Sequence, residues 1–207
     1  IPFHWTLNGT DRLLNLSGAA KFEEQDGITV LYLDGSPLTY AETPAIPIQS
    51  TDLTIAVWVK LMALHSTDQQ IYGDWSFPHQ FRIYVNEDGR LCADARRASG
   101  KPSDIFYHCK GVVSTDVWSH VVMTWGRLNR TVKLYINGEM KLNHVVDDNP
   151  ILDFKNSGHT VYDIGLKRDH EVTIHAYFSD LMIFNSELSE NEIRNELFQN
   201  HPLHSFI

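Results

Sequence analysis

The sequence is poor in several features that mark particular classes of protein. It has only two cysteines, without C-x-x-C spacing, so a zinc finger is excluded unless histidines assist. Acidic residues outnumber basic ones by 26 to 17, and the formal charge of −9 disfavours binding to nucleic acid or to an anionic membrane surface. The longest apolar run, Leu53–Leu64, is interrupted by Lys60 and is too short to cross a bilayer. We therefore expect no nucleic-acid partner and no direct membrane insertion by this domain.

Catalytic motifs are also absent from the sequence. G-x-S-x-G, H-E-x-x-H, G-x-G-x-x-G and Walker-type loops do not occur. Retaining glycoside hydrolysis needs two carboxyl groups about 5–5.5 Å apart, which alternate positions on a strand would provide. Glu23 and Glu24 are adjacent, whereas Glu190 and Glu192 fit a helix cap. The sequence therefore favours a protein that is not an enzyme, with a glycoside hydrolase as the less favoured alternative.

The composition that remains is that of an ordinary globular domain. Hydrophobic residues make up 43% and charged residues 21% of the 207 residues, which excludes a disordered or low-complexity chain. A chain of this length buries about 70% of its unfolded surface. Because no linker-like stretch interrupts the sequence, we expect a single domain over residues 1–207.

Alternating hydrophobic residues predict an all-β fold. Leu53–Leu61 places its leucines, isoleucine and valines on one face, and Val117–Gly126 with Thr131–Asn137 forms the clearest hairpin. Further strands are expected at Phe3–Leu7, Ile28–Leu33, Gln80–Val85, Leu91–Ala95, Ile105–Cys109, Val161–Ile164 and Ala176–Asn185. About a dozen short strands with regular turns are typical of a two-sheet antiparallel jelly-roll sandwich. The least regular segment, Asn8–Gln25, is expected to be a surface loop.

One short C-terminal α-helix is expected. Ser189 fits the N-cap position and Glu192 the N3 position, which together make a capping box. Leu188 and Ile193 are placed to form a hydrophobic staple, and the helix is expected to end before Pro202.

The cysteines and three glycosylation sequons indicate an extracellular protein. Cys92 and Cys109 fall on consecutive predicted strands, where a disulfide is geometrically reasonable, although two buried free thiols are the alternative. The sequons place glycosylation at Asn8, Asn15 and Asn129, the last of which lies in a predicted turn. Disulfides and glycans both belong to oxidising compartments, so we expect a secreted protein or a cell-surface ectodomain.

Four segments in order along the chain resemble a known family. They are Phe3–Leu7; Leu53–Lys60; Trp118–Trp125 with Lys133–Gly138; and Ile164–Gly165 with Phe178–Phe184 and Leu188–Ile193. These segments are similar to the strands and the closing helix of laminin-G-like and pentraxin-like domains in the concanavalin A-like lectin/glucanase superfamily. The resemblance implies a jelly roll, with Trp58, Trp118 and Trp125 in the sandwich core.

The same resemblance implies a role in extracellular recognition, as in the ectodomains of adhesion receptors. We expect a non-catalytic recognition or adhesion module that binds a protein ligand and belongs to a larger cell-surface or secreted protein. The alternative is a lectin-like module that binds carbohydrate, with or without calcium. Self-association through a sheet edge or face is a further expectation left open.

Calcium is the cofactor that the resemblance raises. Pentraxin-like members hold calcium partly through a loop that here reads Gly165–His170, but Lys167 and Arg168 stand where oxygen ligands would be. Only Asp169 remains, and calcium takes about six to eight oxygen ligands. A second candidate set is Asp147, Asp148 and Asn149, although such a run is more often a solvated turn.

Two further features bear on binding. Tyr72, Trp75, Phe77 and His79 concentrate rings among turn residues, so they are the candidate ligand surface, unless the rings fold back over the sandwich edge. The eleven histidines are scattered, which is not typical of a zinc site but predicts a pH-sensitive binding surface.

Overall fold

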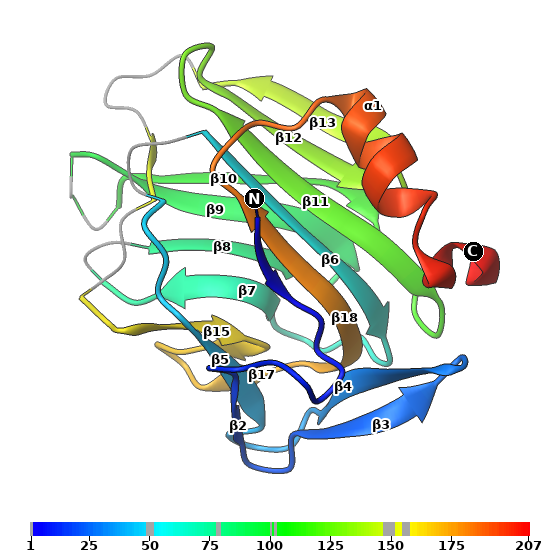
Figure 1. Cartoon of the computed structure of the whole chain (residues 1–207). Helices are drawn as coiled ribbons and strands as arrows, with labels where there is room; N and C mark the ends of the chain where they lie inside the picture. The colour runs from blue at the N-terminus through cyan, green and yellow to red at the C-terminus, as the bar shows by residue number, and fades with distance from the viewer. Residues whose placement is uncertain are drawn as a thin grey trace.

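The computed structural model describes residues 2–48, 52–77, 80–99, 101, 103–146, 152–154 and 158–207. It confirms the predicted all-β sandwich, in which two antiparallel sheets of eight strands face each other (Figure 1). The first sheet has the order β13-β12-β11-β6-β18-β4-β3, and β1 pairs with β18. The second sheet has the order β10-β9-β8-β7-β15-β5-β2, and β14 pairs with β9.

The strands of the first sheet are β1 (Phe3–Trp5), β3 (Lys21–Gln25), β4 (Ile28–Asp34), β6 (Leu53–Leu61), β11 (Trp118–Gly126), β12 (Thr131–Ile136), β13 (Glu139–Val145) and β18 (His175–Phe184). Those of the second sheet are β2 (Asn15–Ser17), β5 (Tyr40–Pro44), β7 (Gln69–Trp75), β8 (Gln80–Val85), β9 (Arg90–Arg97), β10 (Ile105–Val112), β14 (Leu152–Asp153) and β15 (Val161–Ile164). A small separate hairpin joins β16 (Leu166–Lys167) and β17 (Val172–Thr173).

The hydrophobic core lies between the two sheets, as the alternation in β6 predicts. Leu53, Ile55, Val57, Val59 and Leu61 are all buried in this core. Burial of each such side chain stabilises the fold by about 1.5–3 kcal/mol relative to exposure. The alternate residues of β6 point to the opposite face of the first sheet, which must therefore be covered by another element.

The C-terminal segment covers that outer face (Figure 1). The predicted capping box is present: Ser189 Oγ accepts the backbone N–H of Glu192 at 3.1 Å, and the Glu192 carboxylate accepts the N–H of Ser189 at 3.0 Å. The expected short α-helix is present as α1 (Glu190–Glu192). It continues as a π-helix over Ile193–Phe198, which ends before Pro202 as expected, and a 3-10 helix over Pro202–Phe206 follows.

Burial beneath this segment also corrects the expected place of two tryptophans. Trp58 and Trp118 are buried, but they pack under the C-terminal segment with Phe198 and Leu203 rather than between the sheets. Trp125 lies in the core between the sheets, as expected.

Two segments expected to be loops contain strands. Within Asn8–Gln25, β2 joins the second sheet and β3 pairs with β4 across the turn at Asp26 and Gly27. Both turn residues have positive φ, which is the geometry that an Asp-Gly hairpin turn requires. Gln69–Trp75 is strand β7 in the middle of the second sheet.

Candidate functional site

The candidate site begins at a β-bulge in β18. The pairing of β18 with β6 shifts register between Ser179 and Met182, and Asp180 within the bulge has a φ of 47°. A bulge re-aims a side chain and increases the local twist. The backbone N–H of Asp180 donates to the carbonyl of Thr6 at 3.1 Å, which ties the bulge to the N-terminal segment. The Asp180 carboxylate is thereby directed to the outer face of the first sheet.

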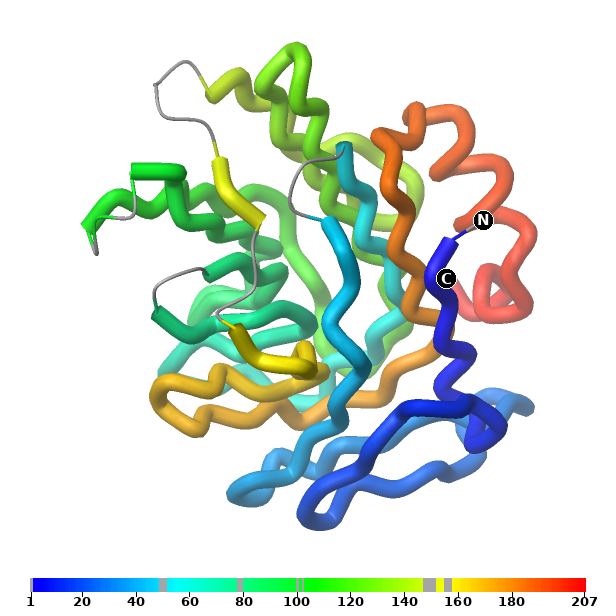
Figure 2. Tube along the Cα trace, turned by 60° about the vertical axis from the view of Figure 1, so that its left-hand side comes forward, coloured from blue at the N-terminus to red at the C-terminus, as the bar shows by residue number. Residues whose placement is uncertain are grey.

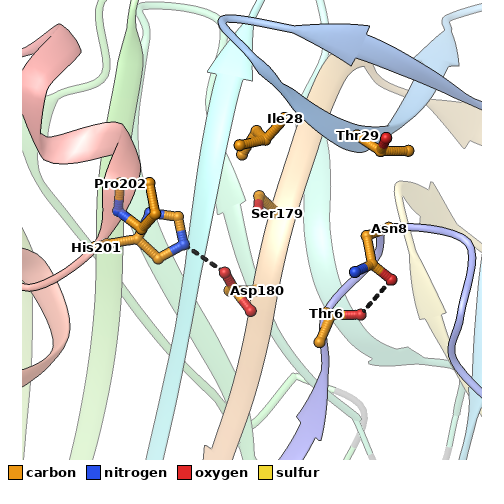
Figure 3. Close-up of a pocket in the computed structure, with 8 residues that line it drawn as sticks. All are labelled: Thr6, Asn8, Ile28, Thr29, Ser179, Asp180, His201 and Pro202. Atoms are coloured by element: carbon orange, nitrogen blue, oxygen red, sulfur yellow. Dashed lines mark hydrogen bonds and ion pairs between the residues drawn. The ribbon is translucent and has the colours of Figure 1, made fainter.

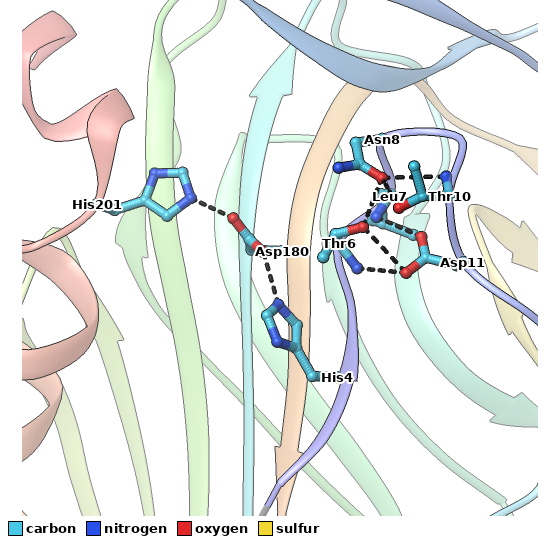
Figure 4. Close-up of polar contacts among 8 residues, drawn as sticks. All are labelled: His4, Thr6, Leu7, Asn8, Thr10, Asp11, Asp180 and His201. Carbon is cyan, nitrogen blue, oxygen red and sulfur yellow. Dashed lines mark hydrogen bonds and ion pairs between the residues drawn. The ribbon is translucent and has the colours of Figure 1, made fainter.

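Two histidines from opposite ends of the chain share this carboxylate (Figure 4). His4 Nε2 lies 2.6 Å from Asp180 Oδ1, and His201 Nε2 bonds to Asp180 Oδ2. His4 belongs to β1, whereas His201 precedes the 3-10 helix of the C-terminal segment. Figure 2 shows the two terminal segments beside each other over the first sheet, so the site is assembled from three distant parts of the sequence.

The electrostatics of this cluster favour an ionised carboxylate. Burial by itself raises the pKa of Asp180, but hydrogen bonds from His201 and His4 outweigh burial and lower that pKa to about 2. The hydrogen bond to Asp180 raises the pKa of His4 against the opposing effect of burial. The cluster therefore presents an anionic acceptor held in place by two donors.

A polar pocket of about 440 Å³ opens beside Asp180 (Figure 3). Its lining combines hydroxyl, amide, carboxylate and imidazole groups with two apolar side chains. The lining residues are Thr6, Asn8, Ile28, Thr29, Ser179, Asp180, His201 and Pro202. This volume lies within the range of about 300–1,000 Å³ that is usual for small-ligand sites.

The N-terminal wall of the pocket is held by local hydrogen bonds (Figure 4). The Asp11 carboxylate accepts the backbone N–H groups of Thr6 at 2.8 Å and Leu7 at 2.7 Å. Asn8 Oδ1 accepts the hydroxyl and the N–H of Thr10 at 2.6 and 3.1 Å. Since these bonds use the oxygen of Asn8, its amide nitrogen is left as a donor at the pocket wall.

A second, smaller cavity adjoins the same carboxylate. Its volume is about 170 Å³, and Trp58, His120, Asp180, Glu196 and His201 are among its lining residues. Trp58 and His120 are cross-strand partners on β6 and β11. Burial lowers the pKa of His120 to about 3, so this imidazole stays neutral.

The structure corrects the expected ligand surface at Tyr72, Trp75, Phe77 and His79. Tyr72 is buried in the core, where its hydroxyl bonds to Thr43 Oγ1 at 2.6 Å. Trp75 is only 6% exposed and packs against the Arg82 guanidinium, 4.5 Å from the ring centroid. Phe77 is exposed, and His79 lies outside the described residues. Strand β7 extends further than expected, and this extension removes two of the rings from the surface.

The predicted disulfide and sequons occupy the expected kinds of position. Cys92 and Cys109 are directly opposite each other on β9 and β10, and a disulfide joins them. Asn8, Asn15 and Asn129 are all exposed, and Asn129 lies in the turn between β11 and β12. Glycosylation of Asn15 and Asn129 stays a prediction, and at Asn8 a glycan would attach to the side-chain nitrogen at the pocket wall.

The calcium candidates are not brought together in the described residues. Asp169 pairs with His170 at 2.8 Å and with Lys167 at 4.0 Å. Arg168 bonds to both carboxylate oxygens of Asp163, at 2.5 and 2.8 Å, and approaches Glu42 at 3.4 Å. The chain's own cations thus neutralise these acids.

The other calcium set, Asp147, Asp148 and Asn149, lies outside the described residues. Elsewhere in the described part of the chain, no three His, Cys, Asp or Glu side chains are arranged to hold a metal. His4 Nε2 and His201 Nε2 bond to different oxygens of the Asp180 carboxylate.

Sequence reasoning did not find the cluster of His4, Asp180 and His201. The alternation in Ala176–Asn185 predicts an uninterrupted strand, and the bulge at Asp180 leaves no distinct pattern. The three residues are 176 and 21 positions apart in sequence, so only the fold brings them together. One available signal was the run of two histidines, His201 and His204, immediately after the predicted helix.

These features define a jelly-roll domain with a ligand-sized pocket on one sheet face. A laminin G family model, described as the concanavalin A-like lectin/glucanases superfamily, matches residues 28–194, and the chain belongs to this family. His4, Asn8 and His201 lie outside the matched range, so the N- and C-terminal walls of the pocket come from segments that flank it. No curated protein sequence matches the chain.

Solved structures with a similar fold include domains of toxins and of an enzyme. Domain 4 of AbnA, a GH43 extracellular arabinanase from Geobacillus stearothermophilus solved with arabinotriose, has a TM-score of 0.73 and 16% identity over 95% of this chain and 97% of its own. The binding domain of Paraclostridial Mosquitocidal Protein 1 has a TM-score of 0.73 and 16% identity over 92% of this chain. The binding domain of Botulinum Neurotoxin serotype G has a TM-score of 0.71 and 14% identity over 93%. The chain spans about half the length of these two toxin domains, 48% and 49%.

The likeness to these structures concerns the fold. Two of the three are binding domains of toxins, and the third is a domain of an enzyme found with a bound oligosaccharide. In the part of the chain that the structure describes, no helix is long and apolar enough to cross a membrane.

Proposed function

We propose that this domain is a non-catalytic recognition module of an extracellular protein and that it binds a glycan in the pocket beside Asp180. The observation that carries this proposal is the lining of that pocket, where three hydroxyl groups, an amide and an ionised carboxylate surround about 440 Å³. Such groups can donate to and accept from the hydroxyl groups of a sugar, with orientation fixed by a few polar contacts. The anionic state of Asp180 supplies the strongest acceptor, because hydrogen bonds to charged groups are the strong ones.

The titration of Asp180 supports binding rather than glycoside hydrolysis. A general acid for that reaction needs a carboxyl group with a raised pKa. Asp180 has the opposite property, since its two histidine donors lower its pKa to about 2. Asp94 has a pKa raised by burial to about 6, but it is 5% exposed and bonds to Arg82 at 3.0 Å.

A protein ligand is the second candidate, and a separate observation favours it. Three leucines around β2 and its neighbouring turn are exposed: Leu13 by 73%, Leu16 by 37% and Leu38 by 48%. Exposed apolar side chains of this kind are common at protein interfaces. The secreted or cell-surface setting, which the disulfide and the exposed sequons support, suits either ligand.

A glycan array with the purified domain tests the proposal. We expect the wild-type domain to bind a defined set of oligosaccharides, with arabinose oligomers included on the array, and to keep this binding with a calcium chelator present. Thr29→Trp, which places a bulky ring at an exposed residue of the pocket, should abolish binding. Asn143→Trp is the matched control, because Asn143 is exposed on β13 at the far edge of the same sheet.

Two results would contradict parts of the proposed function. An array on which the wild type binds nothing would contradict the glycan ligand and favour the protein ligand. Hydrolysis of a polysaccharide panel would contradict the non-catalytic role. Sedimentation over a range of concentrations tests self-association.

A further inference from the structure

The imidazole of His201 packs on side chains from three strands of the first sheet. Its ring stacks on the indole of Trp58, with 4.9 Å between centroids and 29° between planes. Its Nε2 bonds to Asp180, and His120 lies on the other strand beside Trp58, 5.0 Å from it between ring centroids. Trp58, His120 and Asp180 belong to β6, β11 and β18, whereas His201 comes from the C-terminal segment.

His201 also separates the two cavities of this face. The pocket of about 440 Å³ and the cavity of about 170 Å³ are both lined by His201 and Asp180. Trp58 and His120 line only the smaller of the two. Movement of the His201 ring would therefore join the polar pocket to an aromatic surface that is now covered.

The covered surface carries an unused hydrogen-bonding group. His120 is 3% exposed, and its buried Nδ1 has no hydrogen-bond partner among the described residues. An unsatisfied buried polar atom is costly to the fold and calls for an explanation in the native structure. A ligand that reaches this cavity could supply the missing partner.

The bonds that hold His201 in place are few. Besides Asp180 and the face of Trp58, its Nδ1 accepts the backbone N–H of Leu203 at 3.0 Å. Rotation of the side chain would lose this bond, the bond to Asp180 and the ring contacts. A ring with one apolar face and a hydroxyl donor can restore the last two, because it stacks on Trp58 and donates to Asp180.

We propose that Trp58, His120 and Asp180 form a second ligand subsite, continuous with the polar pocket, which takes one hydroxylated ring of the ligand, and that His201 fills it in the unliganded protein. The ligand ring replaces the imidazole on Trp58, donates one hydroxyl to Asp180 and meets His120 with another. The identity of the ring as a sugar rests on the proposed function. The role of His201 as a removable occupant does not rest on it.

Chemical rescue with free imidazole tests whether the His201 side chain fills the proposed subsite. His201→Ala should leave a gap that binds free imidazole, seen as saturable quenching of tryptophan fluorescence and a raised melting temperature. His204→Ala is the matched control, because His204 lies three residues later and contacts Phe198 rather than Asp180. The wild type and the control should show no saturable response, and Trp58→Phe combined with His201→Ala should lose the quenching. A folded His201→Ala that responds no more than the control would overturn the proposal.

A second variant keeps the proposal testable if His201→Ala does not fold. His201→Gln retains an N–H donor for Asp180 but has no ring, so it should keep the segment docked and expose the face of Trp58. A His201→Gln protein that binds imidazole no better than the wild type overturns the occupant role.

A second experiment measures binding of the oligosaccharide that the wild type binds most strongly on the array. If His201 competes for the subsite, His201→Gln should bind this oligosaccharide about tenfold more tightly than the wild type. Weaker binding would overturn the proposal, since His201 would then be a ligand contact. Imidazole rescue without binding of any glycan would support the occupant and overturn the glycan as the ligand, so the two failures are distinguishable.

Discussion

Leu203 donates its backbone N–H to Nδ1 of His201 across 3.0 Å, and this bond decides which nitrogen of His201 faces Asp180. Because Nδ1 is an acceptor, the proton of the neutral ring is on Nε2, which donates to the carboxylate. A contact within the C-terminal segment thus orients the donor that keeps Asp180 ionised.

Asp180→Asn tests how firmly this carboxylate joins the two ends of the chain. The amide retains one acceptor, while its NH₂ group faces one of the two histidine donors. We expect a loss of about 2 kcal/mol in the free energy of unfolding, since hydrogen bonds to charged groups are worth about 1.5–3 kcal/mol. Urea denaturation measures it, with Asp169→Asn in the exposed hairpin loop as the control. Equal stability of the two variants would show that the cluster does not anchor the termini.

The buried imidazole of His120 predicts a loss of stability in acid. Its pKa is about 3 in the folded protein and about 6.5 when unfolded, so the unfolded state binds the proton more readily between these values. The stabilisation is complete above pH 6.5 and falls as the pH decreases toward 3, by about 1.4 kcal/mol per unit.

Unfolding in urea at several pH values, with wild type and His120→Gln, measures this effect. The variant should lose most of the slope between pH 6.5 and 4. His4 acts in the opposite direction: its raised pKa gives stability that is complete below pH 6.5 and is lost as the pH rises. Parallel profiles for wild type and variant would contradict the assignment to His120.

Arg168→Met is expected to destabilise the fold more than its neighbour Lys167→Met. The Asp163 side chain is 1% exposed and relies on Arg168 for two hydrogen bonds. Removal of one partner of a buried pair costs about 3–5 kcal/mol, and the partial exposure of Arg168 places it at the lower end. Among the described residues, Lys167 pairs with the more exposed Asp169, for which at most about 1 kcal/mol is expected.

The pH dependence of these variants provides the control. Burial raises the pKa of Asp163 even in the presence of Arg168, so the unpaired carboxylate can be neutralised by a proton. The defect of Arg168→Met should therefore be smaller at pH 5 than at pH 7.5. A defect that is independent of pH would indicate lost packing instead.

Gly165→Ala should be more damaging than Gly27→Ala, although both glycines have a φ near 80°. A Cβ at Gly165 would lie 2.3 Å from Leu33 Cδ1 and 2.9 Å from Ile174 Cγ2, whereas no described atom lies within 4 Å at Gly27. The left-handed conformation costs about 1–2 kcal/mol in both variants, and overpacking adds about 1–3 kcal/mol at Gly165. Thermal denaturation compares them, and equal losses would contradict the packing role of Gly165.

The alternation of the sequence was sufficient to predict the fold class and most of the strands. Leu53–Leu61 has one apolar face and is the central strand β6, and the Asn-Gly turn after Ile136 is present with positive φ at both residues. The strands that were missed have short or mixed patterns. They are β2, β3, β5, β7, β13, β14, β16 and β17. Gln69–Trp75 is buried on both faces because polar side chains such as Gln70 and Asp74 pack against neighbouring strands, which alternation does not reveal.

The cluster of His4, Asp180 and His201 could not be predicted from the sequence for a different reason. Asp180 faces His4 and His201 only because a bulge interrupts β18 and because both termini cross the same sheet face. The aromatic run at 72–79 had a clear composition, but its place in the fold is set by pairing of β7 with β8 and β15. Local sequence thus predicts elements, whereas the contacts between their outer faces depend on the assembled sandwich.

The most direct test of the central claim is a titration of the labelled wild-type domain with its strongest array glycan, followed through the histidine ring resonances by NMR. The account predicts saturable shifts of His4 and His201 beside the pocket. The resonances of His159, which contacts Asp74 of the second sheet, should stay unchanged. Binding that leaves His4 and His201 unchanged while shifting His159 would place the ligand on the second sheet and contradict the account.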